Sequence, residues 1–438
     1  MKIILSFLLI STTAAAFDTR EEMIQGCRQE VMKMAQKNKF LIFAPIEGND
    51  LAEELVDEPE KMIRRPQDME AKGLITGSAK STPWSDSYWP MYRGGLGQRY
   101  NDPDFNAHEW KEANDYIRTR PASALIREGK LNQLSPSEKY DHLLGLSKFP
   151  LTASQWADGQ RYFSRSGIVE SWMGLCHGWA VASMMMPEPK KKVVVGGMTF
   201  FPSDIKGLAT LLWSRGEFPT RFIGGRCNTQ NPRTDRNGRP SEQNCIDNNP
   251  GSWHLVVVNQ LGISRRPFIM DAAYDYEVWN HPVYSYDYVY FNPKTKTEGK
   301  FIESSVKPGN WDKRKEFRSA DTRTIVGVRM SVIYAVENEA TTEEDQTSES
   351  SSVSFEYDLE LNQSGEIVGG EWHSDTHPDF LWVPEPGTYP LTLGDQLPVN
   401  LENLSPEIKK AALGSAHKGL PMSNLVKTLV KVSSKQGR

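Results

Sequence analysis

The chain of 438 residues has only four cysteines, and its opposite charges nearly cancel to leave a formal net charge of -5. A weak, evenly spread charge excludes the basic field that holds nucleic acid or an anionic membrane. No hydrophobic run is long enough to span a bilayer, which excludes a membrane span. The 38% hydrophobic and 24% charged residues are typical of a globular protein.

The first residues have the layout of a secretory signal peptide. Lys2 precedes an apolar run from Ile3 to Ile10, and small residues stand at Ala14 and Ala16. The run is too short to serve as a stable anchor, so cleavage after Ala16 is expected. We therefore predict a secreted or periplasmic protein that works in an oxidising compartment.

Oxidising conditions permit disulfides, and four cysteines allow three complete pairings. Cys227 and Cys245 bracket a long polar segment rich in turn residues, and such a segment needs a covalent tie. We predict a disulfide between these two cysteines. Cys27 lies on the apolar face of an expected helix within residues 18–38, where it is either a small buried side chain or a disulfide partner.

The composition divides the chain into successive regions. "ENEATTEEDQTSESSS" is acidic, rich in Ser and Thr and devoid of core residues, which indicates a solvated linker. The expected regions are a signal peptide at 1–16, an N-terminal helical region and candidate pro-region at 17–80, a catalytic core at 81–336, the linker at 337–352, and a C-terminal strand pair with a helical tail at 353–438.

Local patterns predict a mixture of helices and strands, an α+β fold. Ser135, Ser203 and Ser405 are expected to cap helices. Strands are expected over the apolar, β-branched runs at 253–263, 266–279 and 324–336, with a strand pair over 353–372. The aromatic, Pro-rich and Gly-rich stretch from 80 to 120 has no regular period, so it is either packed by its own aromatic rings or laid across a site.

The stretch "ESWMGLCHGWA" places Cys176 beside His177 at the expected start of an apolar helix. Amide groups at a helix N-terminus and the helix dipole favour a thiolate, so Cys176 is a candidate nucleophile. His177 is a poor candidate for its base, because adjacent helical side chains point about 100° apart.

A base is expected from the two runs around Gly262. If they form a hairpin with a two-residue turn at Gly262 and Ile263, His254 and Asp271 are cross-strand partners on one face. His254 would then move the proton and Asp271 would orient the imidazole. The inference depends on the register, because a shift of one residue moves the two groups to opposite faces.

Three tryptophans flank these residues in the sequence: Trp172, Trp179 and Trp253. They either belong to the core or form aromatic walls that keep water from a thioester. The backbone amide of Cys176 is one expected oxyanion donor, and Trp172 and Gln160 are candidates for the second.

"HSDTH" would put His373, Asp375 and His377 on one face of an extended chain. Without a fourth ligand, a polar surface network is favoured over a metal site, and no metal residue is predicted.

The segments "WMGLCHGWA", "WHLVVVNQLG", "FIMDAAYDYEVWNHPV", "PWSDSYWPMY" and "GEIVGGEWHSDTHPDFLW" resemble the transglutaminase elicitor family of oomycete plant pathogens, which also has bacterial members. The resemblance covers roughly residues 80 to 383. It implies a papain-like or transglutaminase-like cysteine fold, in which the helix that carries Cys176 packs on an antiparallel sheet. It also implies protein-glutamine γ-glutamyltransferase activity, with Cys176 as nucleophile and His254 and Asp271 as its partners.

The sequence departs from the family within "VWNHPV" (278–283), the segment that resembles the surface peptide perceived by host plants. His281 stands where the oomycete members carry Gln, and residues 284–286 replace basic and glycine residues, so perception of this chain by plants is not implied. Ca²⁺ is a candidate cofactor because many eukaryotic transglutaminases need it. The sequence has no EF-hand ladder, and "TDRNGRPSEQN" is the only suggestive stretch.

The leading interpretation is a secreted transglutaminase that joins protein glutamine to lysine or another amine. The same triad would also serve a cysteine peptidase, a cell-wall amidase or a glutamine deamidase, because attack, oxyanion and thioester are common to all of them. A non-catalytic elicitor or binding protein is the alternative from another class. The sequence leaves the oligomeric state open.

Overall fold

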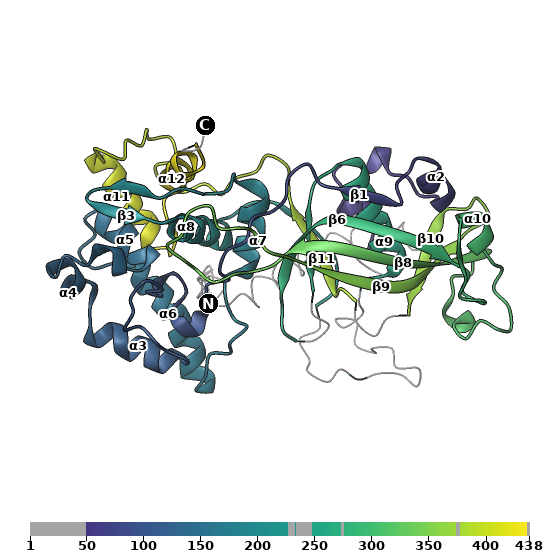
Figure 1. The fold of residues 1–438 in the computed structure, drawn as a ribbon, viewed down its shortest axis with the longest axis horizontal. Coiled ribbons are helices and arrows are strands. Elements are labelled where there is room, and N and C mark those ends of the chain that lie inside the picture. The colour runs from purple at the N-terminus through teal and green to yellow at the C-terminus, as the bar shows by residue number, and fades with distance from the viewer. Residues whose placement is uncertain (1–49, 227–232, 234–247, 273–275, 374–376, 436–438) are drawn as a thin grey trace, which may run out of the picture. The chain divides into compact units, whose positions relative to one another are not determined.

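The computed structural model describes residues 50–226, 233, 248–272, 276–373 and 377–435 (Figure 1). The signal peptide, Cys27 and the predicted Cys227–Cys245 disulfide lie outside the described residues. The described residues fall within one compact unit, Phe43–Arg438.

The α-helices of the described residues are α2 (Pro66–Ala71), α3 (Trp110–Thr119), α4 (Ala122–Arg127), α5 (Pro136–Leu143), α6 (Pro150–Ser166), α7 (Cys176–Met185), α8 (Pro202–Arg215), α9 (Pro250–Val256), α10 (Phe301–Ser304), α11 (Pro406–Ala416) and α12 (Ser423–Lys435). The strands are β1 (Thr76–Ser78), β2 (Val193–Val195), β3 (Met198–Phe200), β4 (Thr220–Gly224), β5 (Phe268–Asp271), β6 (Asn280–Phe291), β7 (Glu298–Gly299), β8 (Thr324–Ala335), β9 (Ser350–Leu361), β10 (Ile367–Trp372) and β11 (Phe380–Pro384). The predicted mixture of helix and antiparallel sheet is confirmed.

Among the described residues, nine strands form one antiparallel sheet in the order β10-β9-β8-β6-β5-β11-β4, and β1 and β7 also pair with β6. Strands β8 and β9 lie side by side along their full length, from Thr324 opposite Leu361 to Ala335 opposite Ser350 (Figure 1). The predicted acidic linker therefore joins two neighbouring strands of one sheet. Within it, the Asn338 N–H donates to the carbonyl of Asp86, and the Thr341 N–H donates to the hydroxyl of Ser203.

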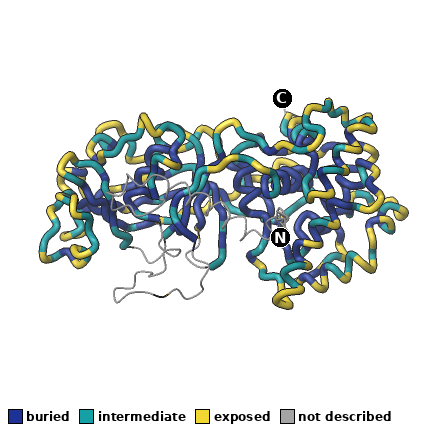
Figure 2. Tube along the Cα trace, turned by 180° about the vertical axis from the view of Figure 1, so that it is seen from behind, coloured by how far each residue is buried: buried dark blue, intermediate teal, exposed yellow. Residues whose placement is uncertain are grey.

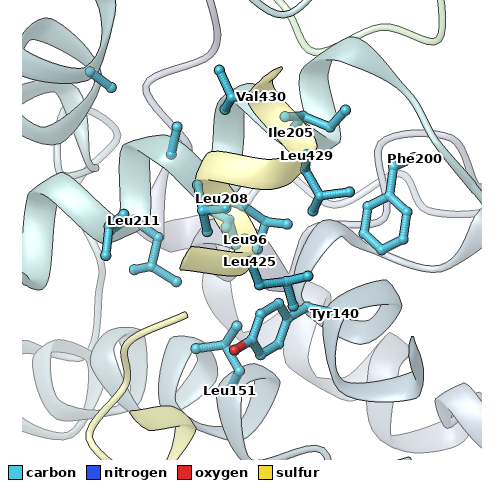
Figure 3. Packing of buried hydrophobic residues seen from close by; sticks show 14 of the residues in the cluster. Leu96, Tyr140, Leu151, Phe200, Ile205, Leu208, Leu211, Leu425, Leu429 and Val430 are labelled. Atoms are coloured by element: carbon cyan, nitrogen blue, oxygen red, sulfur yellow. The ribbon is translucent and has the colours of Figure 1, made fainter. Parts of the chain in front are cut away.

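The described residues contain two large apolar clusters. One gathers α5, α7, α8 and α12, and Figure 3 shows Leu425, Leu429 and Val430 of α12 beside Ile205 and Leu208 of α8. The other gathers the residues around α9 with inward side chains of β6, β8 and β9. Figure 2 traces these buried positions along the chain.

Local signals explain several helix starts. The Ser135 hydroxyl accepts from the Glu138 N–H, and the Glu138 carboxylate accepts from the Ser135 N–H, which closes a capping box at α5. Ser405 caps α11, because its hydroxyl accepts from the N–H of Ile408. Ser203 does not cap α8, because the helix begins one residue earlier at Pro202. Proline suits that first position because its fixed φ is already helical.

The predicted strand at 253–263 is wrong. Residues Pro250–Val256 form α9, and Val257–Ile263 continue as a π-helix. Asn249 caps α9 by accepting from the Gly251 N–H, and Pro250 stands at the first position. Asp271 therefore pairs across β5 and β6 with Asn280, not with His254.

Candidate active site

Cys176 is the first residue of α7, as the sequence predicts, and its side chain is completely buried. The preceding residue offers no side-chain cap to the helix. The first amide groups of a helix have no partner within it, and the helix dipole is positive there. The start of α7 can therefore stabilise a thiolate and, later, an oxyanion.

The glycines around Cys176 are explained by close packing. A Cβ on Gly174 would lie 2.5 Å from the carbonyl oxygen of Tyr88, and one on Gly178 would lie 2.3 Å from the carbonyl oxygen of Thr210. Both distances are far below normal van der Waals contact, so any larger residue would push α7 away from its neighbours.

The aromatic stretch after residue 80 holds α7 in place. The carbonyl of Tyr88 accepts from the Leu175 N–H at 2.6 Å, and the carbonyl of Trp84 accepts from the Trp179 indole at 3.0 Å. The Trp84 indole donates to the carbonyl of Met186 at the other end of the helix. This segment thus fixes both ends of the helix that begins with Cys176.

The sulfur of Cys176 lies 3.6 Å from the side-chain amide Nδ2 of Asn280 and 3.7 Å from the carbonyl oxygen of Val278. The Asn280 amide is oriented from its other end, because its Oδ1 accepts from the indole Nε1 of Trp382 at 2.8 Å. An indole N–H can only donate, so the NH₂ group of Asn280 must face the sulfur. Asn280, in β6, brings a fixed hydrogen-bond donor to the thiol.

Asp271 lies close to this pair, since it is the cross-strand partner of Asn280 on the adjacent strand. Residues paired in this way have side chains on the same face of the sheet. The carboxylate is fully buried and accepts from the Trp279 N–H at 2.9 Å, which closes the turn between β5 and β6. Of the predicted partners of Cys176, Asp271 is the one that the sheet brings towards it.

His254 is placed elsewhere. Its Nδ1 is hydrogen-bonded to the Tyr357 hydroxyl at 2.9 Å, and its ring packs against Tyr288. Complete burial lowers the pKa of His254 to about 3, because the apolar surroundings disfavour the charged imidazolium. The predicted contact between His254 and Asp271 is wrong, since it required the hairpin that is absent from these residues.

His177 points to a neighbouring helix. Its Nε2 lies 2.9 Å from the Ser214 hydroxyl of α8. This placement agrees with the expectation that the adjacent side chains of Cys176 and His177 point in different directions.

The three predicted tryptophans occupy different surroundings. Trp179 belongs to α7 itself, and Trp172 packs with Val278, whose carbonyl touches the sulfur. Trp253 lies in the other apolar cluster, against Phe268 and Phe355. Only Trp172 and Trp179 are therefore near Cys176.

The two predicted second oxyanion donors are already engaged. The Trp172 indole donates to Glu170 at 2.6 Å. Gln160 is exposed and donates to Ser164 within α6. Asn280 contacts the sulfur but was not predicted from the sequence. Its position in "VWNHPV", at the start of a strand with alternating tyrosines, was the available indication of a site residue.

The part of the chain that the structure describes contains no group of three or more His, Cys, Asp or Glu side chains suited to a metal ion. His373 is hydrogen-bonded to Asp358 at 2.8 Å, and His377 stacks on Trp372. Asp375 lies outside the described residues. Within the same part of the chain, no helix is long and apolar enough to cross a membrane.

The chain belongs to the transglutaminase elicitor family, whose model matches residues 58–392. Its fold is similar to the crystal structure of the GP42 transglutaminase from Phytophthora sojae, with a TM-score of 0.56 and 20% identity, over 89% of this chain and 99% of that chain. A search of curated proteins gave no match. At this identity the structural likeness establishes the fold.

Proposed function

We propose that the protein is a secreted or periplasmic protein-glutamine γ-glutamyltransferase with a papain-like thiol site. The observation that carries the proposal is the contact between the buried sulfur of Cys176, at the start of α7, and the oriented amide of Asn280. Membership of the transglutaminase elicitor family supports the same activity.

In the proposed reaction, Cys176 attacks the γ-carboxamide carbon of a protein-bound glutamine. The helix amides at Cys176 and the Nδ2 of Asn280 are the donors that would stabilise the developing oxyanion. Ammonia leaves, and the acyl group stays on sulfur as a thioester. A lysine ε-amine or another primary amine then takes the acyl group and releases the thiol. Asp271, next to Asn280, is the proposed carboxylate of the site.

A labelled primary amine offered with a glutamine-rich protein tests this function. Incorporation of the label by the wild-type protein, with complete loss in Cys176→Ala, is the expected result. Gln160→Ala is the control, since its exposed side chain is hydrogen-bonded to Ser164 within α6 and is not part of the proposed site. Cleavage of the protein substrate without incorporation would identify a peptidase, and release of ammonia without incorporation would identify a deamidase. No turnover by the wild type would favour a non-catalytic elicitor or binding protein.

A further inference from the structure

The sulfur of Cys176 has both a hydrogen-bond donor and a hydrogen-bond acceptor beside it. The donor is the Nδ2 of Asn280 at 3.6 Å, and the acceptor is the backbone carbonyl oxygen of Val278 at 3.7 Å. We propose that this carbonyl, positioned by Asp271, selects a primary carboxamide as substrate by accepting one of its N–H groups. The inference rests on the proposed function, because it assigns the group that recognises the glutamine side chain in the same thiol reaction.

A primary carboxamide is complementary to this donor and acceptor. Its carbonyl oxygen accepts hydrogen bonds, and its NH₂ group donates two. When the amide carbon approaches the Cys176 sulfur, its oxygen and its nitrogen come to the groups that already contact that sulfur. The oxygen meets the Nδ2 of Asn280, and the nitrogen meets the carbonyl of Val278. A γ-carboxylate or a γ-ester has no N–H to donate to that carbonyl.

The Val278 carbonyl loses its sulfur partner during the reaction. In the structure the S–H group of Cys176 donates to it. Acylation removes that hydrogen, because the sulfur of a thioester carries none. Val278 is completely buried, and the loss of a donor to a buried carbonyl costs free energy unless another donor replaces it. The substrate N–H can replace the S–H, so this hydrogen bond forms as sulfur attacks and favours the transition state.

Asp271 fixes the direction of the same carbonyl. Its Oδ1 accepts from the Trp279 N–H at 2.9 Å. That N–H and the Val278 carbonyl belong to one planar trans peptide group, in which the two bonds point in opposite directions. The Trp279 carbonyl accepts in turn from the Ala272 N–H at 3.0 Å. The peptide group therefore cannot turn its carbonyl away from the sulfur without breaking the hydrogen bond to Asp271.

The surroundings of Val278 strengthen its carbonyl as an acceptor. A carboxylate bonded to the N–H of a peptide group polarises that group and increases the negative charge on its oxygen. The side chains around Val278 are apolar, since it lies in one buried cluster with Trp172 and Phe380, and Trp279 packs against that cluster. Because water is excluded from apolar surroundings, an N–H···O bond made there is stronger than in bulk water.

The atoms of both half-reactions balance with these groups. Sulfur bonds to the carboxamide carbon, the carbon–nitrogen bond breaks, and the thiol proton ends on the nitrogen that leaves as ammonia. In the second half the amine enters where ammonia left, the carbon–sulfur bond breaks, and one amine proton returns to sulfur. A primary amine keeps one N–H for the Val278 carbonyl in the product, whereas a secondary amine keeps none. Primary amines are therefore the expected acceptors.

Three γ-derivatives of one glutamine peptide test the assignment: the carboxamide, the N-methylcarboxamide and the methyl ester. All three give the same thioester, so label incorporation at saturating amine reports the kcat/KM of acylation for each. The ester is the most reactive of the three towards a thiol in solution, but on this protein we expect the carboxamide to have the higher kcat/KM. The N-methylcarboxamide has the size of the ester and keeps one N–H, so it separates size from hydrogen bonding.

Asp271→Ala tests the positioning of the carbonyl. We expect kcat/KM for the two amides to fall about 5- to 150-fold further than for the ester, the range for an unsatisfied buried acceptor. Asp271→Asn keeps an oxygen for the Trp279 N–H and should restore most of this preference. Asp141→Ala is the matched control, because Asp141 is also buried and accepts backbone N–H groups, at the start of α6. It should keep the wild-type preference among the three substrates.

The outcomes separate this inference from the proposed function. A higher kcat/KM for the ester than for the carboxamide in the wild type would overturn the role of Val278 and leave the thiol reaction standing. Equal losses for all three substrates in Asp271→Ala would also overturn it, since a purely structural role lowers them together. If Asp271→Ala unfolds, the wild-type series decides alone. Acylation of none of the substrates, or the same activity in Cys176→Ala, would overturn the proposed function and this inference with it.

Discussion

The oriented amide of Asn280 offers the sharpest perturbation of the proposed oxyanion site. Removal of one preorganised oxyanion donor lowers kcat by about 10² to 10³, or roughly 3 to 4 kcal/mol. We expect a loss of this size in Asn280→Ala, because its Nδ2 is the side-chain donor at the Cys176 sulfur. The assay is the kcat of amine incorporation at saturating glutamine substrate.

Trp382→Phe tests the orientation separately from the donor. The change removes the N–H that holds the Asn280 Oδ1 at 2.8 Å and leaves the amide in place. A neutral hydrogen bond contributes about 0.5 to 1.5 kcal/mol net, so kcat should fall about two- to tenfold. Trp213→Phe is the control, because the buried Trp213 indole has no hydrogen-bond partner within the described residues.

A wild-type kcat in Asn280→Ala would refute the reasoning. It would show that the Nδ2 of Asn280 does not stabilise the oxyanion, although it contacts the sulfur. Equal losses in Trp382→Phe and Trp213→Phe would refute the orientation argument alone. In that case the effect of Trp382 would be one of packing.

Three further changes test the fold around the site. The folded pKa of His254, about 3, is below the unfolded value near 6.5, so the unfolded chain binds the extra proton between these two values. From pH 7.5 to pH 5, the urea-unfolding stability of the wild type should therefore fall by about 2 kcal/mol relative to that of His254→Gln. Glu138→Gln breaks a buried ion pair with Arg99 and should cost about 3 to 5 kcal/mol in the same assay. Gly174→Ala should lose about 1 to 3 kcal/mol of stability and most amine incorporation, because its methyl group would overlap the backbone of Tyr88.

Two control variants keep these tests specific. Asp115→Asn breaks an exposed pair with Lys111 and should change stability by less than about 0.5 kcal/mol. Gly414→Ala meets only the end of the Leu393 side chain, which can move aside. The same pH dependence of stability in the wild type and His254→Gln, or losses as large in these controls as in the site variants, would contradict the burial arguments.

The sequence predicts those parts of the fold that depend on short-range signals. The capping box at Ser135 and the cap at Ser405 involve residues three apart, and both helices start where expected. The strands β8, β9 and β10 follow from apolar, β-branched runs with turn residues between them. The start of α7 at Cys176 follows from its apolar residues after a glycine.

The error at 253–263 has a physical cause. All the residues from Trp253 to Leu261 are buried, so the run has no alternation that would separate a strand from a buried helix. Valines favour strands, but tertiary packing overrides so weak a preference. Asn249 and Pro250 were the available signals for a helix start.

The partners of Cys176 could not be predicted from local patterns. The sulfur is 104 positions away from Asn280 in the sequence. The contact depends on the pairing of β5, β6 and β8, which fixes where β6 begins and what lies beside it. The sequence predicts Asp271 near the site, but through a hairpin with the wrong partner. The strand that pairs with β5 is β6, and not the segment 253–263.

The most direct test of the central claim is an acid-quenched mass measurement of the protein mixed with a glutamine peptide in the absence of an amine. The account predicts a covalent adduct equal to the peptide less one ammonia, attached at Cys176 and released by added amine. Adduct formation at another residue, or amine incorporation by a protein in which Cys176 is never acylated, would contradict it.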